Sequence, residues 1–204
     1  MRKYLLVLCI IATTATLKAQ DMAVNVFGGY VFGDDVTLDY GYGHVDESAI
    51  FGGSLEFMMP RNVSVELSYQ HQSTTASANQ GLISDKGNIT VGYAMVEGNR
   101  YAKFKEKFSG YFGGGLGVGI VTPDGNYETI CRLAWKIKAG ILMTPSDKFG
   151  IKVGMQLNSL VQGIGGGLYF GTGGAGAGAT AYSSIYQFGF HGGIYFRFGK
   201  DGSN

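Results

Sequence analysis

A chain of 204 residues is the length of a single domain, and only 15% of its residues are charged, where about 25% is typical of a water-soluble protein. Glycine and aromatic residues are abundant instead, with 35 Gly, 13 Tyr and 13 Phe, so something other than water is expected to face much of the surface. The formal net charge of +1 falls to −2 if the first 19 residues are removed, because Arg2, Lys3 and Lys18 leave with them and 13 basic residues remain against 15 acidic ones; this balance excludes nucleic acid as a partner.

The first residues have the organisation of a cleavable secretory signal peptide. Arg2 and Lys3 give a positive start, and the apolar run 5–11 that follows is much shorter than the roughly 20 residues that a membrane-spanning helix needs. We predict cleavage after Ala19, so that residues 1–19 are the signal peptide and residues 20–204 form one domain. Cys131 is then the only cysteine left, which excludes an internal disulfide.

From Gln20 onward the side chains alternate with a period of two, which is the period of a β-strand. In the stretch 89–95, for example, Ile89, Val91, Tyr93 and Met95 form a bulky apolar stripe with smaller residues opposite. Short turns and longer polar loops separate the stretches in alternation, and an even number of strands suits a closed antiparallel barrel. The eight predicted strands are 24–32, 49–59, 63–70, 89–95, 108–120, 131–141, 151–158 and 186–198.

The bulky stripes could fill a soluble barrel or face lipid from the outside of a membrane barrel. The interior of an eight-stranded barrel is just wide enough to be filled by side chains, so it cannot hold all of these large residues. The bulky stripes also contain no Asp, Glu, Lys or Arg. We therefore predict that they face lipid and that the small, glycine-rich stripes face the interior, as in an all-β, eight-stranded antiparallel transmembrane β-barrel.

The small stripes contain charged residues, which must be paired or hydrated if they face the interior. Glu56, Glu66, Lys138 and Lys152 are predicted to lie at similar depth, and inward glycines between Gly113 and Gly119 would make room for long Lys and Arg side chains opposite. Such a network could merely fill the lumen or could line a selective passage. The predicted lumenal ion network is Glu56, Glu66, Arg132, Lys136, Lys138, Lys152 and Arg197.

Aromatic residues gather toward the two ends of the predicted strands, which is typical of the girdles at the interfaces of a membrane barrel. Ordinary β-propensity would explain their abundance but not this clustering. The predicted girdles consist of Tyr30, Phe32, Phe51, Tyr69 and Tyr93 on the long-loop side and Phe57, Phe108, Phe149, Phe196 and Phe198 on the short-turn side.

The connections alternate between short turns at 60–62 and 144–148 and long loops at 33–48, 73–88, 122–128 and 159–181. This alternation predicts short periplasmic turns, periplasmic termini and long extracellular loops. The predicted loops are mostly acidic and the turns mostly basic. The acidic loops could bind divalent cations shared with lipopolysaccharide phosphates, or their charges could simply be solvated.

The segment from Gly52 to Tyr69, GGSLEFMMPRNVSVELSY, resembles the second hairpin of small OmpA/OmpX-like outer-membrane barrels, and the whole predicted mature chain fits their plan. The Ala19-Gln20 junction resembles signal-peptide sites common in Bacteroidetes. The resemblance implies a porin-like barrel in the bacterial outer membrane, with outer-membrane lipid, lipopolysaccharide and the barrel assembly machinery as partners. Members often end on a terminal Phe that the assembly machinery recognises, whereas residues 199–204 follow Phe198 here.

Candidate chemical groups are few. His71 and Ser73 share one strand face and resemble the His-x-Ser pair of lipid A deacylases, although the family's neighbouring Asn and basic residue are absent. His44 in the first long loop and His191, predicted to face the lumen, are interpreted as ordinary polar residues, so we predict no metal and no cofactor. The glycine-rich run 171–178 lacks the Lys-Ser/Thr ending of a phosphate-binding loop and is interpreted as a mobile external loop.

The sequence therefore predicts a non-enzymatic outer-membrane barrel whose lumen is plugged by an ion network and which supports the cell envelope or presents loops to an unknown surface ligand. A narrow porin for small solutes is the alternative, and a lipid-modifying acyl hydrolase is a third possibility.

Overall fold

The structure is a computed structural model that describes residues 21–38, 41–80, 83–124, 129–161, 167–171, 174–178 and 185–198. The predicted signal peptide and its cleavage point lie outside these residues. No helix in the described part is long and apolar enough to cross a membrane. The regular elements in the described ranges are all strands: β1 (Met22–Val31), β2 (Asp34–Leu38), β3 (Gly41–Val45), β4 (Ser48–Met59), β5 (Val63–Gln80), β6 (Ile83–Lys105), β7 (Phe108–Pro123), β8 (Ile130–Met143), β9 (Phe149–Leu160), β10 (Gly167–Gly171), β11 (Gly174–Gly178) and β12 (Ile185–Phe198).

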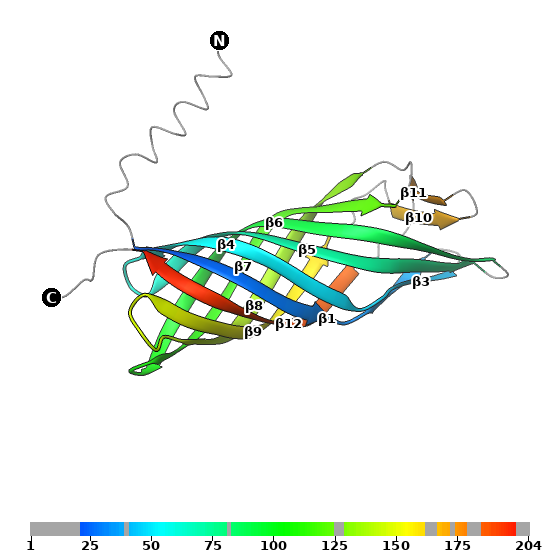
Figure 1. The fold of residues 1–204 in the computed structure, drawn as a ribbon. Helices are drawn as coiled ribbons and strands as arrows, with labels where there is room; N and C mark the ends of the chain where they lie inside the picture. Colours follow the sequence, from blue (N-terminus) through cyan, green and yellow to red (C-terminus); the bar gives the residue numbers. More distant parts are fainter. Residues whose placement is uncertain are drawn as a thin grey trace, which may run out of the picture.

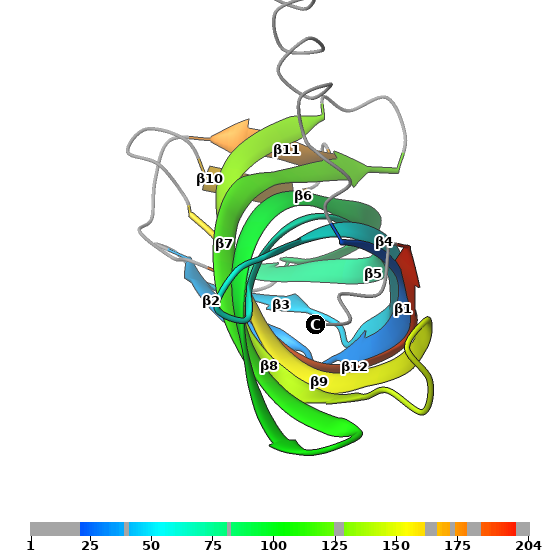
Figure 2. The same ribbon diagram turned by 90° about the vertical axis from the view of Figure 1, so that its left-hand side faces the viewer.

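Eight long strands form a closed antiparallel barrel in the order β1, β4, β5, β6, β7, β8, β9 and β12. The barrel closes between its first and last strands, where Met22 pairs with Phe198 and Val31 with Gly189. Figure 2 shows the resulting ring from the end where the short turns lie. The predicted fold class is confirmed.

The strands on one side continue well beyond the barrel wall (Figure 1). β5 and β6 pair as far as Gln80 and Ile83, and β3 pairs with β2 on one side and β5 on the other. The predicted loops at 33–48 and 73–88 are therefore mostly strand. A strand with polar side chains is stable when its backbone groups are paired. Polarity alone therefore did not distinguish a loop from a strand here.

The described residues of the glycine-rich run 171–178 belong to strands, where a loop was predicted. β10 and β11 form a hairpin in which Leu168 pairs with Ala177. At the other end of the barrel, the tight turn between β4 and β5 places Arg61 and Asn62 at positive φ, 67° and 58°. Asn tolerates this left-handed conformation well, whereas Arg rarely adopts it.

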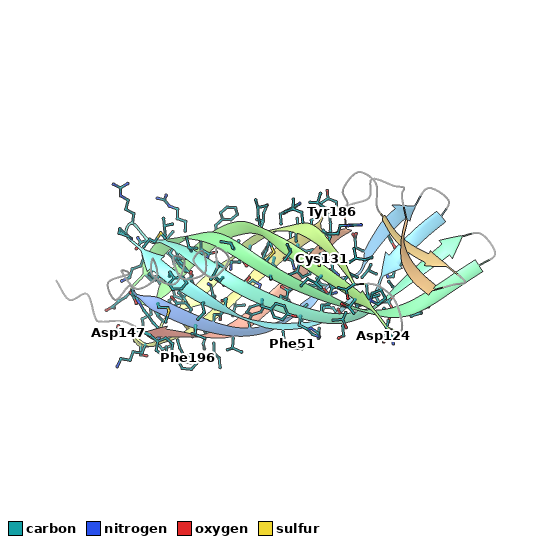
Figure 3. All side chains as sticks on the ribbon, turned by 90° about the horizontal axis from the view of Figure 1, so that it is seen from above. Phe51, Asp124, Cys131, Asp147, Tyr186 and Phe196 are labelled. Carbon is teal, nitrogen blue, oxygen red and sulfur yellow. The ribbon has the colours of Figure 1, made fainter. Side chains whose placement is uncertain are left out.

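The bulky stripes face outward on seven of the eight barrel strands, as predicted. On β7, for example, Phe112 is 64% exposed while its neighbour Tyr111 is buried. Figure 3 shows side chains at the two ends of the barrel: Phe196 and Asp147 lie toward the short-turn end, and Tyr186 and Cys131 lie toward the opposite end.

The exception is β6, where the predicted face is wrong. Ile89, Val91, Tyr93 and Met95 are buried in the interior, and Val96 faces outward. The register explains the reversal, because the outward-facing Leu67 of β5 pairs with Val96, so the odd-numbered residues of β6 must face the lumen.

Candidate functional site in the barrel interior

A layer of buried ionic side chains crosses the lumen. Its acids lie side by side on one rung of the sheet, because Glu56 of β4 pairs with Glu66 of β5, which in turn pairs with Glu97 of β6. Its bases come from the opposite wall, where β8 carries Lys136 and Lys138 and β9 carries Lys152. All six side chains are buried, and their formal charges cancel.

The ion pairs join the two walls directly. Lys138 Nζ lies 2.6 Å from Glu66 Oε2 and 2.6 Å from Glu97 Oε2, so one ammonium group bridges two carboxylates. Lys136 Nζ lies 3.3 Å from Glu97 Oε1, and Lys152 Nζ lies 3.1 Å from Glu56 Oε2. A longer contact of 3.6 Å joins Lys152 to Glu66. Each buried charge therefore has an opposite charge beside it, as burial requires.

Neutral groups also donate hydrogen bonds to these carboxylates. Glu56 accepts hydrogen bonds from Ser64 and from the hydroxyl of Tyr101, the latter at 2.5 Å. Glu66 accepts one from Asn99 Nδ2 at 2.7 Å. Glu97 accepts one from Ser68. These bonds fix the carboxylates in place, so the ionic layer is a connected network rather than a set of separate pairs.

Tyrosines line the lumen on the short-turn side of this layer. The rings of Tyr101, Tyr111 and Tyr195 surround the ammonium group of Lys152, whose Nζ lies 4.9 Å from the centroid of Tyr111. The same tyrosines pack with Ala23 and Leu142 in one buried cluster. Cation–π contact adds to the stabilisation of a lysine that water cannot reach.

A polar and then an apolar layer fill the lumen on the long-loop side. Gln156 Nε2 donates to Gln70 Oε1 at 2.8 Å, and Tyr93 donates to Gln187 Oε1 at 3.0 Å, both across the barrel. Beyond them lies a buried apolar cluster. Its members are Val45, Ala76, Ile89, Val91, Tyr93, Met95, Val121, Ala134 and Leu160.

The cavity at the ionic layer is small. It is lined by Glu66, Glu97, Lys136, Lys138 and neighbouring side chains, and its volume is only about 10 Å³. This is roughly the space that one water molecule needs. The side chains of the ionic layer therefore leave little space between them at this level.

The predicted network and the observed layer overlap but differ in membership. Glu56, Glu66, Lys136, Lys138 and Lys152 lie together. Arg197 belongs elsewhere, because its guanidinium pairs with Asp21 at the exposed short-turn rim. Arg132 is half-buried nearer the long-loop end of β8, opposite Gly119.

The prediction missed Glu97 because the strand was expected to end at Met95. A signal was present in the sequence, since Glu97, Asn99 and Tyr101 continue the odd-numbered positions of 89–95. A charged residue in phase with this stripe marks it as the inward face.

The inward glycines of β7 lie beside Lys136, Lys138 and Arg132 of β8 in the register, and they also make room for side chains of β6. A Cβ at Gly115 would lie 2.8 Å from Cγ of Glu97, and one at Gly117 would lie 2.7 Å from Sδ of Met95. The glycines of β7 therefore accommodate the large side chains of β6 beside them. This local pairing explains how the interior holds the inward stripe of β6.

The predicted girdle residues occupy mixed positions. Tyr93 is wrongly placed by the prediction, because it is 1% exposed and belongs to the lumen. Phe57 and Phe149 are half-buried. The others are exposed on the outer surface: Tyr30, Phe32, Phe51, Tyr69, Phe108, Phe196 and Phe198. Several touch one another, with Phe32 stacked on Phe188 at one end and Phe149 against Phe196 at the other.

The structure also places the histidines. Ser73 Oγ lies 3.3 Å from His71 Nε2 on the outer face of β5, where the backbones of both residues are paired with β6. Paired backbone amides are not available as an oxyanion hole.

His191 Nε2 lies 2.8 Å from the hydroxyl of Tyr111 in the lumen, and His44 contacts Asp35 at 2.7 Å outside the barrel. Among the described residues, no group of three or more His, Cys, Asp or Glu side chains is placed to hold a metal ion.

Comparison with known proteins identifies the fold. No protein-family profile and no curated protein sequence matches the chain. Among solved structures, Neisserial surface protein A is similar with a TM-score of 0.62 and 7% identity, over 87% of this chain and 97% of that one. The outer membrane protein OprG from Pseudomonas aeruginosa is similar with a TM-score of 0.62 and 13% identity, over 90% of this chain and 98% of that one. The chain therefore has the fold of small outer-membrane β-barrels.

Proposed function

We propose that this protein is an integral outer-membrane β-barrel without enzymatic activity, whose lumen is plugged and which supports the envelope or presents its external strands to a surface partner. The observation that carries the proposal is the filled lumen. A tyrosine cluster, the ionic layer, a polar layer and an apolar cluster follow one another along the axis.

The energetics of the ionic layer argue against a narrow porin. A passing solute would have to separate Lys138 from two carboxylates that lie 2.6 Å away. Removing one partner of a buried pair costs about 3–5 kcal/mol. The apolar cluster around Val91 and Leu160 would have to open as well. Both barriers act in series, so steady conduction is not expected.

The outer surface supports a membrane location. Apolar side chains such as Phe112, Leu116 and Ile137 are exposed around the barrel wall, which would be unfavourable in water but suits hydrocarbon. We place the short turns and the termini in the periplasm and the extensions of β5 and β6 outside the cell. In this setting, outer-membrane lipid and lipopolysaccharide surround the wall, and the barrel assembly machinery inserts the chain.

Planar bilayer recording of the purified mature protein tests the plug. The native protein is expected to give no steady conductance, whereas a variant with Glu66→Ala, Lys138→Ala and Leu160→Ala, which shortens side chains in two layers, is expected to leak. Lys86→Ala, in the exposed extension of β6, is the matched control and should stay silent. Steady conductance of the native protein would overturn the plug and favour the porin.

A separate assay tests for hydrolysis. Incubation with labelled lipid A or phospholipid is expected to release no acyl chain, because the His71–Ser73 pair lies on a strand whose backbone pairs with β6 at both residues. Acyl release by the native protein that disappears in Ser73→Ala would replace the proposal with an enzyme.

A further inference from the structure

A shallow apolar groove lies on the outside of the barrel across β1, β4, β5 and β6. Its volume is about 570 Å³. Two rungs of outward-facing residues line the groove, and the rung nearer the long-loop end pairs from strand to strand through Val26, Gly53, Tyr69 and Ala94. The next rung toward the short-turn end finishes at Val96.

The absence of a side chain at Gly53 creates this groove. A Cβ at Gly53 would have only the carbonyl oxygen of Asn25 nearby, at 3.5 Å. Val26 and Tyr69 stand out on either side, 60% and 50% exposed. These apolar walls offer water few hydrogen bonds, and a void beside lipid loses dispersion contacts, so hydrocarbon is the expected filling.

Two arginines lie on the same wall, between the groove and the short-turn end of the barrel. Arg100 is exposed on the outer face of β6, four residues beyond Val96, and it pairs with Val63 at the start of β5. Arg61 is exposed in the turn that precedes Val63. Neither guanidinium has an ion pair within the described ranges. Gly98 lies between Val96 and Arg100, and a Cβ there would meet nothing within 4 Å, so the path from groove to arginines is open.

We propose that this wall is a binding site for one anionic phospholipid of the periplasmic leaflet, with its phosphate on Arg61 and Arg100 and one acyl chain in the groove. This inference rests on the membrane location proposed above. The guanidinium group suits phosphate because it donates two parallel hydrogen bonds.

The dimensions fit a single leaflet. At about 3.3 Å per residue, the four-residue step from Arg100 to Val96 spans roughly 13 Å along the strand, and because barrel strands tilt by about 35–45° this is roughly 10 Å along the membrane normal. Half of a hydrocarbon core that is about 30 Å thick is about 15 Å. A lipid whose phosphate lies at Arg100 therefore brings the distal part of its acyl chain to the groove.

Photocrosslinking of the full mature chain in phosphatidylcholine vesicles tests the site. The probe is a trace of phosphatidylglycerol with a diazirine near the end of one acyl chain, and mass spectrometry maps the labelled residues. Labels are expected to concentrate around Gly53 and Ala94. Gly53→Leu should fill the groove and abolish these labels, whereas Gly192→Leu, an outward glycine of β12 with equally open space, should not.

The headgroup contact is tested by competition with unlabelled lipids. Arg61→Gln with Arg100→Gln should lower the preference for phosphatidylglycerol over phosphatidylcholine by roughly 25-fold, about fivefold for each arginine. Lys86→Gln, on the external extension, should leave the preference unchanged. Excess inorganic phosphate should displace little probe, because it cannot fill the groove.

Labels spread evenly around the barrel, an unchanged lipid preference in the arginine variant, or crosslinks to a second copy at Gly53 would each overturn the site. Heat-modifiable migration and protease protection of the same samples report insertion, so loss of the lipid site is distinguishable from failure of the proposed membrane barrel. If Gly53→Leu does not insert, Ala94→Leu tests the same groove from the neighbouring strand.

Discussion

Replacement of Lys138 by Met is expected to destabilise the barrel more than any other single change in the ionic layer. Its ammonium group bridges Glu66 and Glu97 at 2.6 Å each. After the substitution, Glu97 keeps Lys136 at 3.3 Å and Glu66 keeps Lys152 at 3.6 Å, and the buried layer carries one uncompensated negative charge. Leaving such a charge costs about 3–5 kcal/mol of unfolding free energy.

A double variant separates charge from packing. Lys138→Met with Glu66→Gln removes one charge of each sign, and the remaining groups keep the pairs of Lys136 with Glu97 and Lys152 with Glu56. Replacing a buried ion pair by neutral groups is often nearly neutral, so the double variant should recover to within about 1 kcal/mol of the native protein. Lys138→Met alone has no such compensation.

Urea unfolding of the protein in vesicles, followed through the fluorescence of Trp135, the only tryptophan in the chain, measures these free energies. Trp135 packs against Tyr186 on the outside of the barrel, so its emission reports loss of the wall. If Lys138→Met costs less than about 1 kcal/mol, or if the double variant is no more stable than the single one, the ionic layer does not hold the barrel together in the way described.

Three further substitutions give distinct expectations in the same unfolding measurement. Tyr93→Phe should cost about 1 kcal/mol through its lost lumenal hydrogen bond; no loss would favour the outward position first predicted. Gly154→Ala should cost about 1–3 kcal/mol, because the added methyl group meets the hydroxyl of Tyr111 and the backbone carbonyl oxygen of Ala139, and a neutral result would show that both can shift freely. Arg197→Gln should lower the free energy of unfolding by less than about 1 kcal/mol, because the pair of Arg197 with Asp21 is exposed. A loss as large as that of Lys138→Met would support the predicted membership of Arg197 in the lumenal ion network.

The sequence predicted the barrel well because two physical requirements act on every strand. A lipid-facing stripe must lack charge, and a narrow lumen must be lined mostly by small or paired residues. The two faces of β7 meet both requirements, because Phe112 and Leu116 alternate with glycines. Only one face of this strand can therefore face lipid.

The same rules failed for β6 because local side-chain size does not decide burial there. Met95 can face inward only because the neighbouring strand offers Gly117, and this compensation depends on the register between two strands. The phase of β6 was nevertheless fixed by Glu97, which cannot face hydrocarbon without a partner. The strand extensions beyond the barrel lacked a comparable signal, because polar residues such as Thr75 and Ser77 suit a loop and an exposed strand equally.

The ionic layer is best understood as a device that specifies closure and register. Glu56, Glu66 and Glu97 are direct neighbours on three adjacent strands, and like charges in that position repel one another. The repulsion is relieved only when the barrel closes and β8 and β9 place Lys138, Lys136 and Lys152 opposite these carboxylates. A slip of one residue in any of these strands would turn a charge toward lipid and leave its partners unpaired. The charges of the ionic layer therefore also disfavour incorrectly paired barrels, which accounts for residues that are costly to bury at the centre of this fold.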